Sequence, residues 1–215
     1  MLSTDRSVNR PNHQNDRDSS NARRRILDAA RQQFADRGYT AAPMRQIATD
    51  AGVTKTMVYY YFGSKEGLYR ALLDEVYLAV RARLRAAMTV GDTPRQRLVS
   101  LAKLHLDFIR DNADTSNLML RACMPAAGDD APAVDVERFR SLHIEALRDI
   151  LSTDAPTGAL PDALPDADLE LLAAVFHGAM GALRHDTVCG NDTPADLPEK
   201  IVELLWGGFA ARIDP

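Results

Sequence analysis

The feature that most constrains this chain is residues 44–65, MRQIATDAGVTKTMVYYYFGSK. Within this stretch, Met44, Ile47 and Ala51 recur with the period of a helix that buries one face. Gly52 then interrupts the pattern. Because glycine adopts a positive φ without steric cost, it can end one helix and turn the chain into the next. The sequence therefore predicts two short helices joined by a tight turn.

The second of these helices has an apolar face and a polar face. Thr54 is a suitable N-cap, because its hydroxyl can accept a hydrogen bond from a free backbone N–H. Val58 and Phe62 face the first helix, and this spacing is the pattern of a DNA-binding helix-turn-helix. The outward side chains are of types that reach base edges or phosphates: Lys55, Thr56, Tyr59 and Tyr60. A generic helical hairpin with a solvated polar face is the alternative that the pattern leaves open.

The charges are divided unequally along the chain, whose net charge is −4. Residues 23–70 contain nine Arg or Lys against four Asp or Glu, a net charge of +5. Residues 71–215 contain fourteen against twenty-three, a net charge of −9. Affinity for phosphates is therefore expected in the basic segment, and the acidic remainder argues against coating of the whole surface by nucleic acid.

Residues 24–72 match a known family pattern without a gap. The matching positions are Ile26, Leu27, Ala29, Ala30, Phe34, Gly38, Tyr39, Ile47, Ala48, Ala51, Gly52, Val53, Tyr59, Tyr60, Phe62, Lys65 and Leu68. With these residues the segment resembles the N-terminal domain of the tetracycline-repressor (TetR) family of bacterial transcription regulators. It differs at Ala42, where the family usually has a threonine that caps the second helix, and Thr40 is the expected substitute. Tyr61 stands where histidine is common.

The resemblance implies an all-α protein. An N-terminal three-helix DNA-binding domain with the helix-turn-helix precedes a larger C-terminal helical domain for ligand binding and dimerisation. The expected divisions are a disordered, polar arm over residues 1–20, the DNA-binding domain over 21–66 and the C-terminal domain over 67–215. Lys65, at the start of a helix, is expected to point at the phosphate backbone. The predicted DNA contacts are Arg24, Arg45, Thr54, Lys55, Thr56, Tyr59, Tyr60 and Lys65.

The rest of the chain reads as helices, and no segment alternates with the period of a strand. A long helix is predicted from Lys65 to about Val90, with an apolar residue every fourth position. Thr93-Pro94 then provides an N-cap followed by proline in the first turn of the next helix. Beyond the long helix, helices are expected at about 94–111, 118–123, 133–152, 168–187 and 195–212.

The inward faces of these helices carry methionine, phenylalanine and histidine, a mixture suited to an apolar cavity with a few polar groups. The same residue types are equally at home in a filled core. The predicted ligand-binding residues are Met88, His105, Phe108, Met119, Phe139, His143, Phe176 and Met180. No cluster of basic residues falls on these faces, so a strongly anionic effector is not expected. Ala146→Phe is the substitution expected to fill the cavity.

Small residues on one side of the helix at 168–187 would let a second helix approach closely: Gly178, Ala179, Gly181 and Ala182. In the resembled family, this region and the final helix pair across a two-fold axis into a four-helix bundle. A homodimer through the helices at about 168–187 and 195–212 is therefore predicted, and close packing within one chain is the alternative. A two-fold dimer suits an inverted repeat, because each of two heads can read one half-site.

Several other classes of protein are not supported. The sequence contains no HExxH, P-loop, dinucleotide-binding or GxSxG motif, so no enzyme, cofactor or metal site is predicted. No apolar run approaches the roughly 18–20 residues of a membrane span. The polar N-terminus lacks the apolar segment of a secretory signal, and Cys123 and Cys189 are too far apart to suggest a metal motif. A cytoplasmic location without membrane contact is expected.

Two hypotheses for the function remain. The first is a ligand-responsive transcriptional regulator, with repression as the expected mode of action. It binds an inverted-repeat DNA operator as a homodimer and is released by a small, largely apolar effector. The alternative is a TetR-like DNA-binding architectural or protein-partnered factor without a small-molecule effector. A cavity lined by the predicted Met, Phe and His residues would favour the first, and a filled core the second.

Overall fold

The computed structural model describes residues 13–123, 126–152, 168, 170–176, 178–179 and 194–213. All regular secondary structure in these residues is helical, which confirms the predicted all-α class. Residues 170–176 are also helical. The helices with defined bounds are α1 (His13–Ala41), α2 (Met44–Asp50), α3 (Lys55–Phe62), α4 (Lys65–Met88), α5 (Pro94–Asp111), α6 (Ala113–Cys123), α7 (Val136–Ser152) and α9 (Leu197–Ile213).

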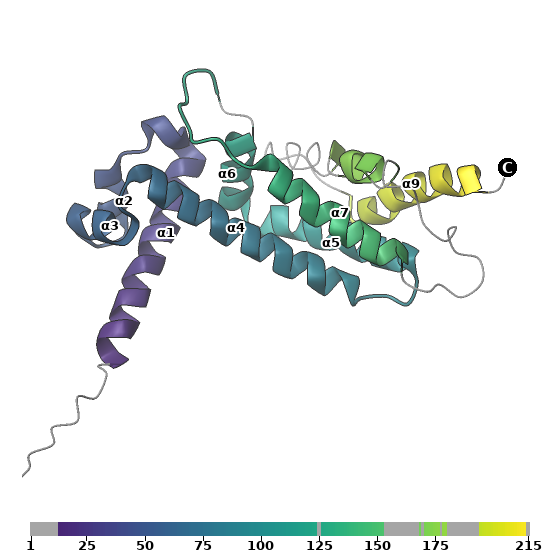
Figure 1. Cartoon of the computed structure of the whole chain (residues 1–215), viewed down its shortest axis with the longest axis horizontal. Coiled ribbons are helices and arrows are strands. Elements are labelled where there is room, and N and C mark those ends of the chain that lie inside the picture. Colours follow the sequence, from purple (N-terminus) through teal and green to yellow (C-terminus); the bar gives the residue numbers. More distant parts are fainter. Residues whose placement is uncertain are drawn as a thin grey trace, which may run out of the picture.

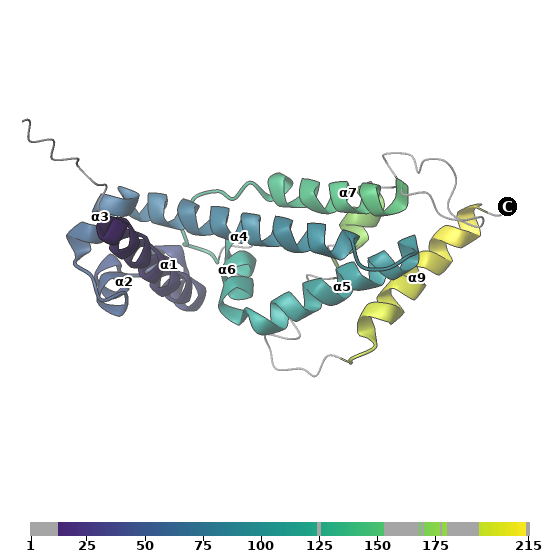
Figure 2. The same ribbon diagram turned by 90° about the horizontal axis from the view of Figure 1, so that it is seen from below.

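The long helix α4 connects the two halves of the molecule (Figure 1). The first three helices gather around its N-terminal end and form the head. Helices α5 and α7 run along opposite sides of its C-terminal half, and α9 packs beyond them against α5 (Figure 2). Helix α6 lies between the two halves (Figure 1). We call the part formed by the C-terminal half of α4 together with α5, α6, α7 and α9 the body.

The local signals in the sequence set the ends of the helices largely as predicted. The Thr54 hydroxyl accepts a hydrogen bond from the backbone N–H of Met57 at 3.2 Å, and Gly52 has a φ of +63° in the preceding turn. Thr93 and Gln96 cap the start of α5 reciprocally, as a threonine before Pro94 predicts. The predicted helix at 94–111 has the bounds expected for it.

The structure differs from expectation at the start of the chain. Residues 13–20 belong to α1 rather than to a disordered arm, and residues 1–12 lie outside the described residues. The chain turns at Gly38, whose φ is +78°. Thr40 does not cap α2, because Pro43 occupies the N-cap and the Thr40 hydroxyl instead accepts a hydrogen bond from the backbone N–H of Asp130. Helix α7 begins at Val136, three residues later than predicted.

Two apolar clusters hold the molecule together. The cluster in the head surrounds Phe34, Ile47 and Val58, and it also contains residues 118, 119 and 122 of α6 and Phe139 of α7. The second cluster joins the C-terminal half of α4 to α5, α7, residues 172–176 and α9. The expected domain boundary at residue 66 therefore lies within a continuous core, and α6 packs as part of the head as well as of the body.

Candidate functional site

The polar face of α3 is presented outward by a fully buried anchor. Val58 has no exposed surface, whereas 82% of Tyr60 and 40% of Tyr59 is exposed. The Thr54 cap fixes the first turn of the helix. Large aromatic side chains usually bury most of their area. The exposure of Tyr60 fits the predicted contact face of α3, whose binding of DNA stays a prediction.

The other predicted DNA contacts are exposed too, with one difference. Lys55 is exposed, and its Nζ lies 5.6 Å from the centre of the Tyr59 ring. Arg24 on α1 and Arg45 on α2 are also exposed. The Arg25 guanidinium lies beside the turn, 3.5 Å from where a side chain at Gly52 would begin. Arg25 belongs to a run of three arginines at residues 23–25 that can contact phosphates, and its contact with DNA stays a prediction.

Lys65 is the exception, because it is half-buried at the base of the head. Its ammonium group donates a hydrogen bond to the carbonyl oxygen of Thr40 at 3.0 Å and lies 5.0 Å from the centre of the Tyr39 ring. Burial lowers the pKa of Lys65. The Thr40 bond uses one of the three donors of this group. Contact of Lys65 with phosphate stays a prediction, and the structure gives the residue a second role in holding the head together.

A polar joint connects the head to α6 and to the loop that follows α6. The Arg121 guanidinium donates to the carbonyl oxygens of Ala35 at 2.7 Å and Asp36 at 3.1 Å, near the end of the regular part of α1. The Asp129 carboxylate accepts from the backbone N–H groups of Tyr39 at 3.1 Å and Thr40 at 2.7 Å. These contacts satisfy backbone groups that a helix end leaves unpaired. We call Arg121 and Asp129, with the backbone they bind, the joint.

The charge of Asp129 is stabilised by the joint. Burial raises the pKa of this carboxyl. The hydrogen bonds from Thr40 and Tyr39 and the charge of Arg121 lower the pKa by more than burial raises it, so it lies below the usual range. The φ of Gly38 favours glycine, and a side chain there would begin 2.7 Å from an Asp129 oxygen and would displace that carboxylate. The hydrogen bonds of the joint connect residues up to 90 positions apart, and no periodic pattern in the sequence indicates their contact.

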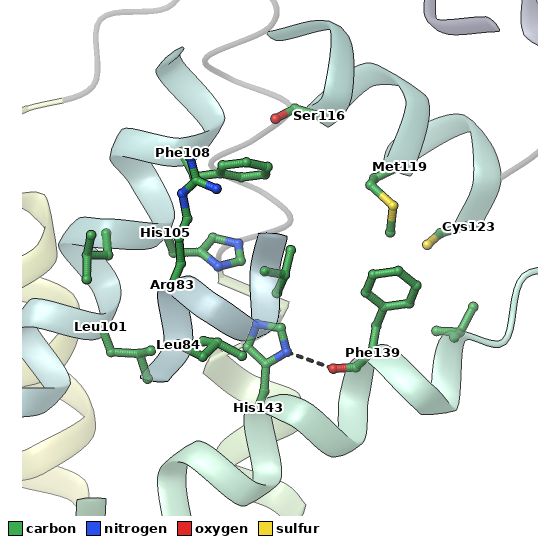
Figure 3. Close-up of a pocket in the computed structure, with 13 residues that line it drawn as sticks. Arg83, Leu84, Leu101, His105, Phe108, Ser116, Met119, Cys123, Phe139 and His143 are labelled. Carbon is green, nitrogen blue, oxygen red and sulfur yellow. Dashed lines mark hydrogen bonds between the residues drawn. The ribbon is translucent and has the colours of Figure 1, made fainter. Parts of the chain in front are cut away.

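A cavity lies in the body where four helices meet (Figure 3). The volume that the centres of water molecules can occupy in it is about 60 Å³. This is several times the roughly 10–15 Å³ that one water molecule needs. Apolar side chains form most of its wall. The lining residues are Val80, Arg83 and Leu84 of α4; Leu101, Leu104, His105 and Phe108 of α5; Ser116, Met119 and Cys123 of α6; and Val136, Phe139 and His143 of α7.

Most of the predicted ligand-binding residues meet in this cavity: His105, Phe108, Met119, Phe139 and His143.

The remaining three do not line it. Met88 and Phe176 pack in the second apolar cluster. Met88 lies farther along α4 than the cavity extends, and the described lining residues include none from the helix of Phe176. Met180 lies outside the described residues. Ala146 also packs in that cluster, so Ala146→Phe would not fill the cavity.

The sequence reasoning missed the polar lining residues Arg83 and Ser116. Val80, Arg83 and Leu84 are spaced as one helical face, which was an available signal for Arg83. Its guanidinium carbon lies 4.4 Å from the centre of the Phe108 ring. No hydrogen-bonding pattern in the sequence distinguished Ser116.

The two histidines of the cavity are paired. Their ring centres lie 5.6 Å apart, with the planes inclined at 62°. His143 is 3% exposed, and its Nδ1 lies 2.9 Å from the carbonyl oxygen of Phe139. A carbonyl oxygen only accepts, so Nδ1 carries the proton. His143 is therefore a buried, hydrogen-bonded residue that also lines the cavity, and its contact with a ligand stays a prediction.

The helices predicted to form a dimer carry exposed apolar side chains. Leu171 is 54% exposed, Val175 45% and Leu204 on α9 79%. Gly178 has open space where a side chain would begin. Leu171, Val175 and Gly178 share one helical face. Gly181 and Ala182 of the predicted interface lie outside the described residues.

The residues that the structure describes contain no group of three side chains able to hold a metal ion. None of the described helices is both long enough and apolar enough to cross a membrane.

Comparison with known proteins gives consistent matches. The family model for bacterial regulatory proteins of the tetR family matches residues 26–72. The chain is 30% identical over 191 residues to the HTH-type transcriptional activator FasR of Mycolicibacterium smegmatis, an alignment that covers 87% of this chain and 83% of the relative. It is 33% identical over 189 residues to the HTH-type transcriptional repressor NicS of Pseudomonas putida, covering 87% and 88%.

Among solved structures, a TetR-like transcriptional regulator from Rhodococcus sp. RHA1 has the same fold. The TM-score is 0.69, the sequence identity is 26%, and the match covers 88% of this chain and 96% of the other.

Proposed function

This chain belongs to the tetR family of bacterial regulatory proteins, and we propose that it binds an inverted-repeat DNA operator as a homodimer and responds to a small effector. The family membership makes it a helix-turn-helix transcriptional regulator and not an enzyme. The operator, the dimer, the effector and a cytoplasmic location belong to the proposal.

The exposed polar face of α3 is the single observation that carries the DNA-binding part. In the proposed complex, Lys55 and Thr56 read base edges in the major groove, while Thr54, Tyr59 and Tyr60 bond the phosphate backbone. Arg24, Arg25 and Arg45, on neighbouring helices, add positive charge beside this face.

Dimerisation is supported by the exposed leucines and valine of the C-terminal helices. A monomer would leave Leu171 and Val175, which lie one helical turn apart, and Leu204 of α9 in water. Exposed apolar side chains grouped on a helical face commonly mark an interface. Two-fold pairing there would set the spacing of two heads, as an inverted repeat requires.

Regulation is proposed to pass through α6. Met119 lines the cavity and also belongs to the apolar cluster of the head, and Arg121 binds the end of α1. Helix α4 is one connection, because its residues belong to the head cluster and also line the cavity. The joint adds a second connection. A ligand that favours one position of α6 would shift the head, with a coupling of about 1–3 kcal/mol.

We propose repression released by a largely apolar effector as the sign of this regulation. The relatives include one activator and one repressor. Similarity therefore does not decide between activation and repression, and repression belongs to the proposal. The cavity favours an effector over the alternative of an architectural or protein-partnered factor, because such a factor would need no largely apolar cavity in its body.

An unbiased selection from random duplex DNA with the full-length protein tests the DNA-binding part. The expected product is an inverted repeat, bound with one protomer on each half-site. Recovery of no preferred sequence would contradict the operator and would favour the architectural alternative.

Filling the cavity tests the effector part. Val80→Phe places a ring into the space from α4 and should abolish release of the selected duplex by an apolar ligand that acts on the wild-type protein. Leu78→Phe, on the exposed face of the same helix, is the control and should respond normally. A normal response of Val80→Phe would contradict the assignment of the cavity as the effector site.

A further inference from the structure

Among the described residues, the wall of the cavity contains one arginine, and its guanidinium stacks on an aromatic ring of the neighbouring helix. Arg83 reaches the cavity from α4, and its guanidinium carbon lies 4.4 Å from the centre of the Phe108 ring on α5. The stacking of a guanidinium on an aromatic face is favourable and restricts its orientation. No ion pair among the described residues includes Arg83.

A buried hydroxyl lines the same cavity from α6. Ser116 is 2% exposed, and its Oγ has no hydrogen-bond partner among the described residues. A buried hydroxyl without a partner costs free energy that a hydrogen bond from or to a ligand would recover. In the view of Figure 3, Arg83, Phe108 and Ser116 lie toward one side, and Met119, Cys123 and Phe139 lie toward the other.

We infer that the cavity takes a monoanionic amphiphile. Its carboxylate lies at Arg83 and Ser116, and its apolar body lies among Leu84, Met119 and Phe139. The guanidinium donates two parallel hydrogen bonds to the carboxylate, and the Ser116 hydroxyl donates a third. This inference rests on the proposed function of the cavity as an effector site, and it names the chemical class of the effector.

Charge and size narrow the class further. Arg83 is the single arginine or lysine among the described lining residues and can neutralise one negative charge, whereas a polyanion would leave charges buried and unpaired. A single negative charge on the effector agrees with the lack of a basic cluster on the inward faces of the helices. The sequence did not predict the arginine, Arg83, in the wall. The cavity holds the equivalent of a few water molecules. A short alkyl chain or a single ring therefore fits without large movement of the helices.

Matched pairs of acids and amides test the inference on the full-length protein. The probes are hexanoate, octanoate and phenylacetate, each beside its neutral primary amide of nearly the same shape. Binding is measured by calorimetry at constant ionic strength. The wild-type protein should bind at least one acid tenfold or more tightly than its amide.

Substitutions assign that preference to the two residues. Arg83→Gln should remove the preference for the acid and leave binding of the amide unchanged. Ser116→Ala should weaken the acid severalfold. Arg83→Lys, which keeps the charge without the planar fork, should retain part of the preference. Arg81→Gln changes an exposed arginine of the same helix and should have no effect.

The outcomes separate this inference from the proposed function. Equal binding of acid and amide by the wild-type protein, binding of no probe, or equal weakening of both by Arg83→Gln would overturn the inference. Release of the operator is measured separately. If an acid binds through Arg83 without releasing DNA, the inference stands and the proposed regulation fails. If amides release DNA as well as acids do, the regulation stands and the inference fails.

Discussion

The outer face of α3 and the wall of the cavity carry similar kinds of polar side chain in different settings. On α3, Lys55, Tyr59 and Tyr60 are exposed within two turns of one helix and make few contacts inside the chain. In the cavity, Arg83 and Ser116 come from different helices and are held against an apolar wall. Substitutions on α3 should therefore change DNA binding alone, whereas substitutions in the cavity change packing and binding together.

The two lysines at either end of the head show the same contrast on a smaller scale. Lys55 is exposed, while Lys65 is half-buried and bonded to Thr40. A half-buried, hydrogen-bonded residue such as Lys65 contributes to the stability of the head as well as to any binding of DNA. Variants that separate stability from binding are the way to test each region.

The largest effect is expected from the proposed dimer interface. The double variant Leu171→Glu, Leu204→Glu buries charge at a two-fold contact and should leave monomers. Without linkage of the two half-sites, affinity for the selected inverted repeat should fall by roughly a hundredfold or more. Analytical ultracentrifugation and DNA titration measure the two changes.

Leu78→Glu is the matched control for that variant, because Leu78 is 57% exposed and Leu171 54%. It should remain dimeric. A dimer that survives the double substitution would place the interface elsewhere.

A smaller effect is expected from the exposed lysine of α3. Lys55→Ala should weaken binding of the selected duplex by about 1–3 kcal/mol and relax the preference at one base pair, without lowering the melting temperature. Lys65→Ala should weaken all duplexes alike and should also lower the melting temperature, because the bond to Thr40 is lost. Equal losses on selected and random DNA for both variants would refute this division.

The features of the structure that the sequence predicts are those that depend on neighbouring residues. The turn at Gly52, the cap at Thr54 and the anchor Val58 depend on neighbours within one or two helical turns, so their pattern predicted the structure. His105 and His143 were found through the helical period of apolar faces. Their meeting with residues of α4 and α6 depended on tertiary packing.

The parts that could not be predicted depend on contacts between distant segments. Asp129 lies in a loop without periodicity, and its partners Tyr39 and Thr40 lie about ninety residues earlier. The start of α1 at His13 was missed because its first residues are polar and expected to be disordered. Met88 lies on the expected face of α4, but the cavity ends before its turn of the helix.

The joint is expected to contribute a moderate amount to stability. Arg121→Met removes two hydrogen bonds from a charged donor to the end of α1 and should lower the free energy of unfolding by about 1–3 kcal/mol. Amide exchange of Tyr39 and Thr40 should become faster. Arg110→Met, which breaks only an exposed pair with Asp107, should change neither. Unchanged exchange in Arg121→Met would remove the joint as a connection between α6 and the head.

The smallest effect concerns the pH dependence of the joint. Because the folded protein holds the pKa of Asp129 below its usual range, the ionised carboxylate stabilises the fold above the unfolded value of about 3.9. That contribution is lost as the pH falls from this value through the folded pKa. Since Asp129 is partly exposed, it amounts to a few tenths of a kcal/mol.

Asp129→Asn should therefore flatten the acid limb of the stability curve measured by denaturant unfolding. Asp107→Asn, in an exposed pair, is the control. An acid limb as steep as that of the wild-type protein would show that Asp129 does not titrate in this way.

The most direct measurement is the affinity of the full-length protein for the selected inverted repeat, and for a single half-site, as the salt concentration rises. A basic head that binds DNA through two copies of α3 should bind the inverted repeat far more tightly. The logarithm of the association constant should fall linearly with the logarithm of the salt concentration, by roughly 0.9 for each phosphate neutralised. A constant that stays flat between low and physiological salt, or that is the same for the half-site, would contradict DNA recognition by a dimer.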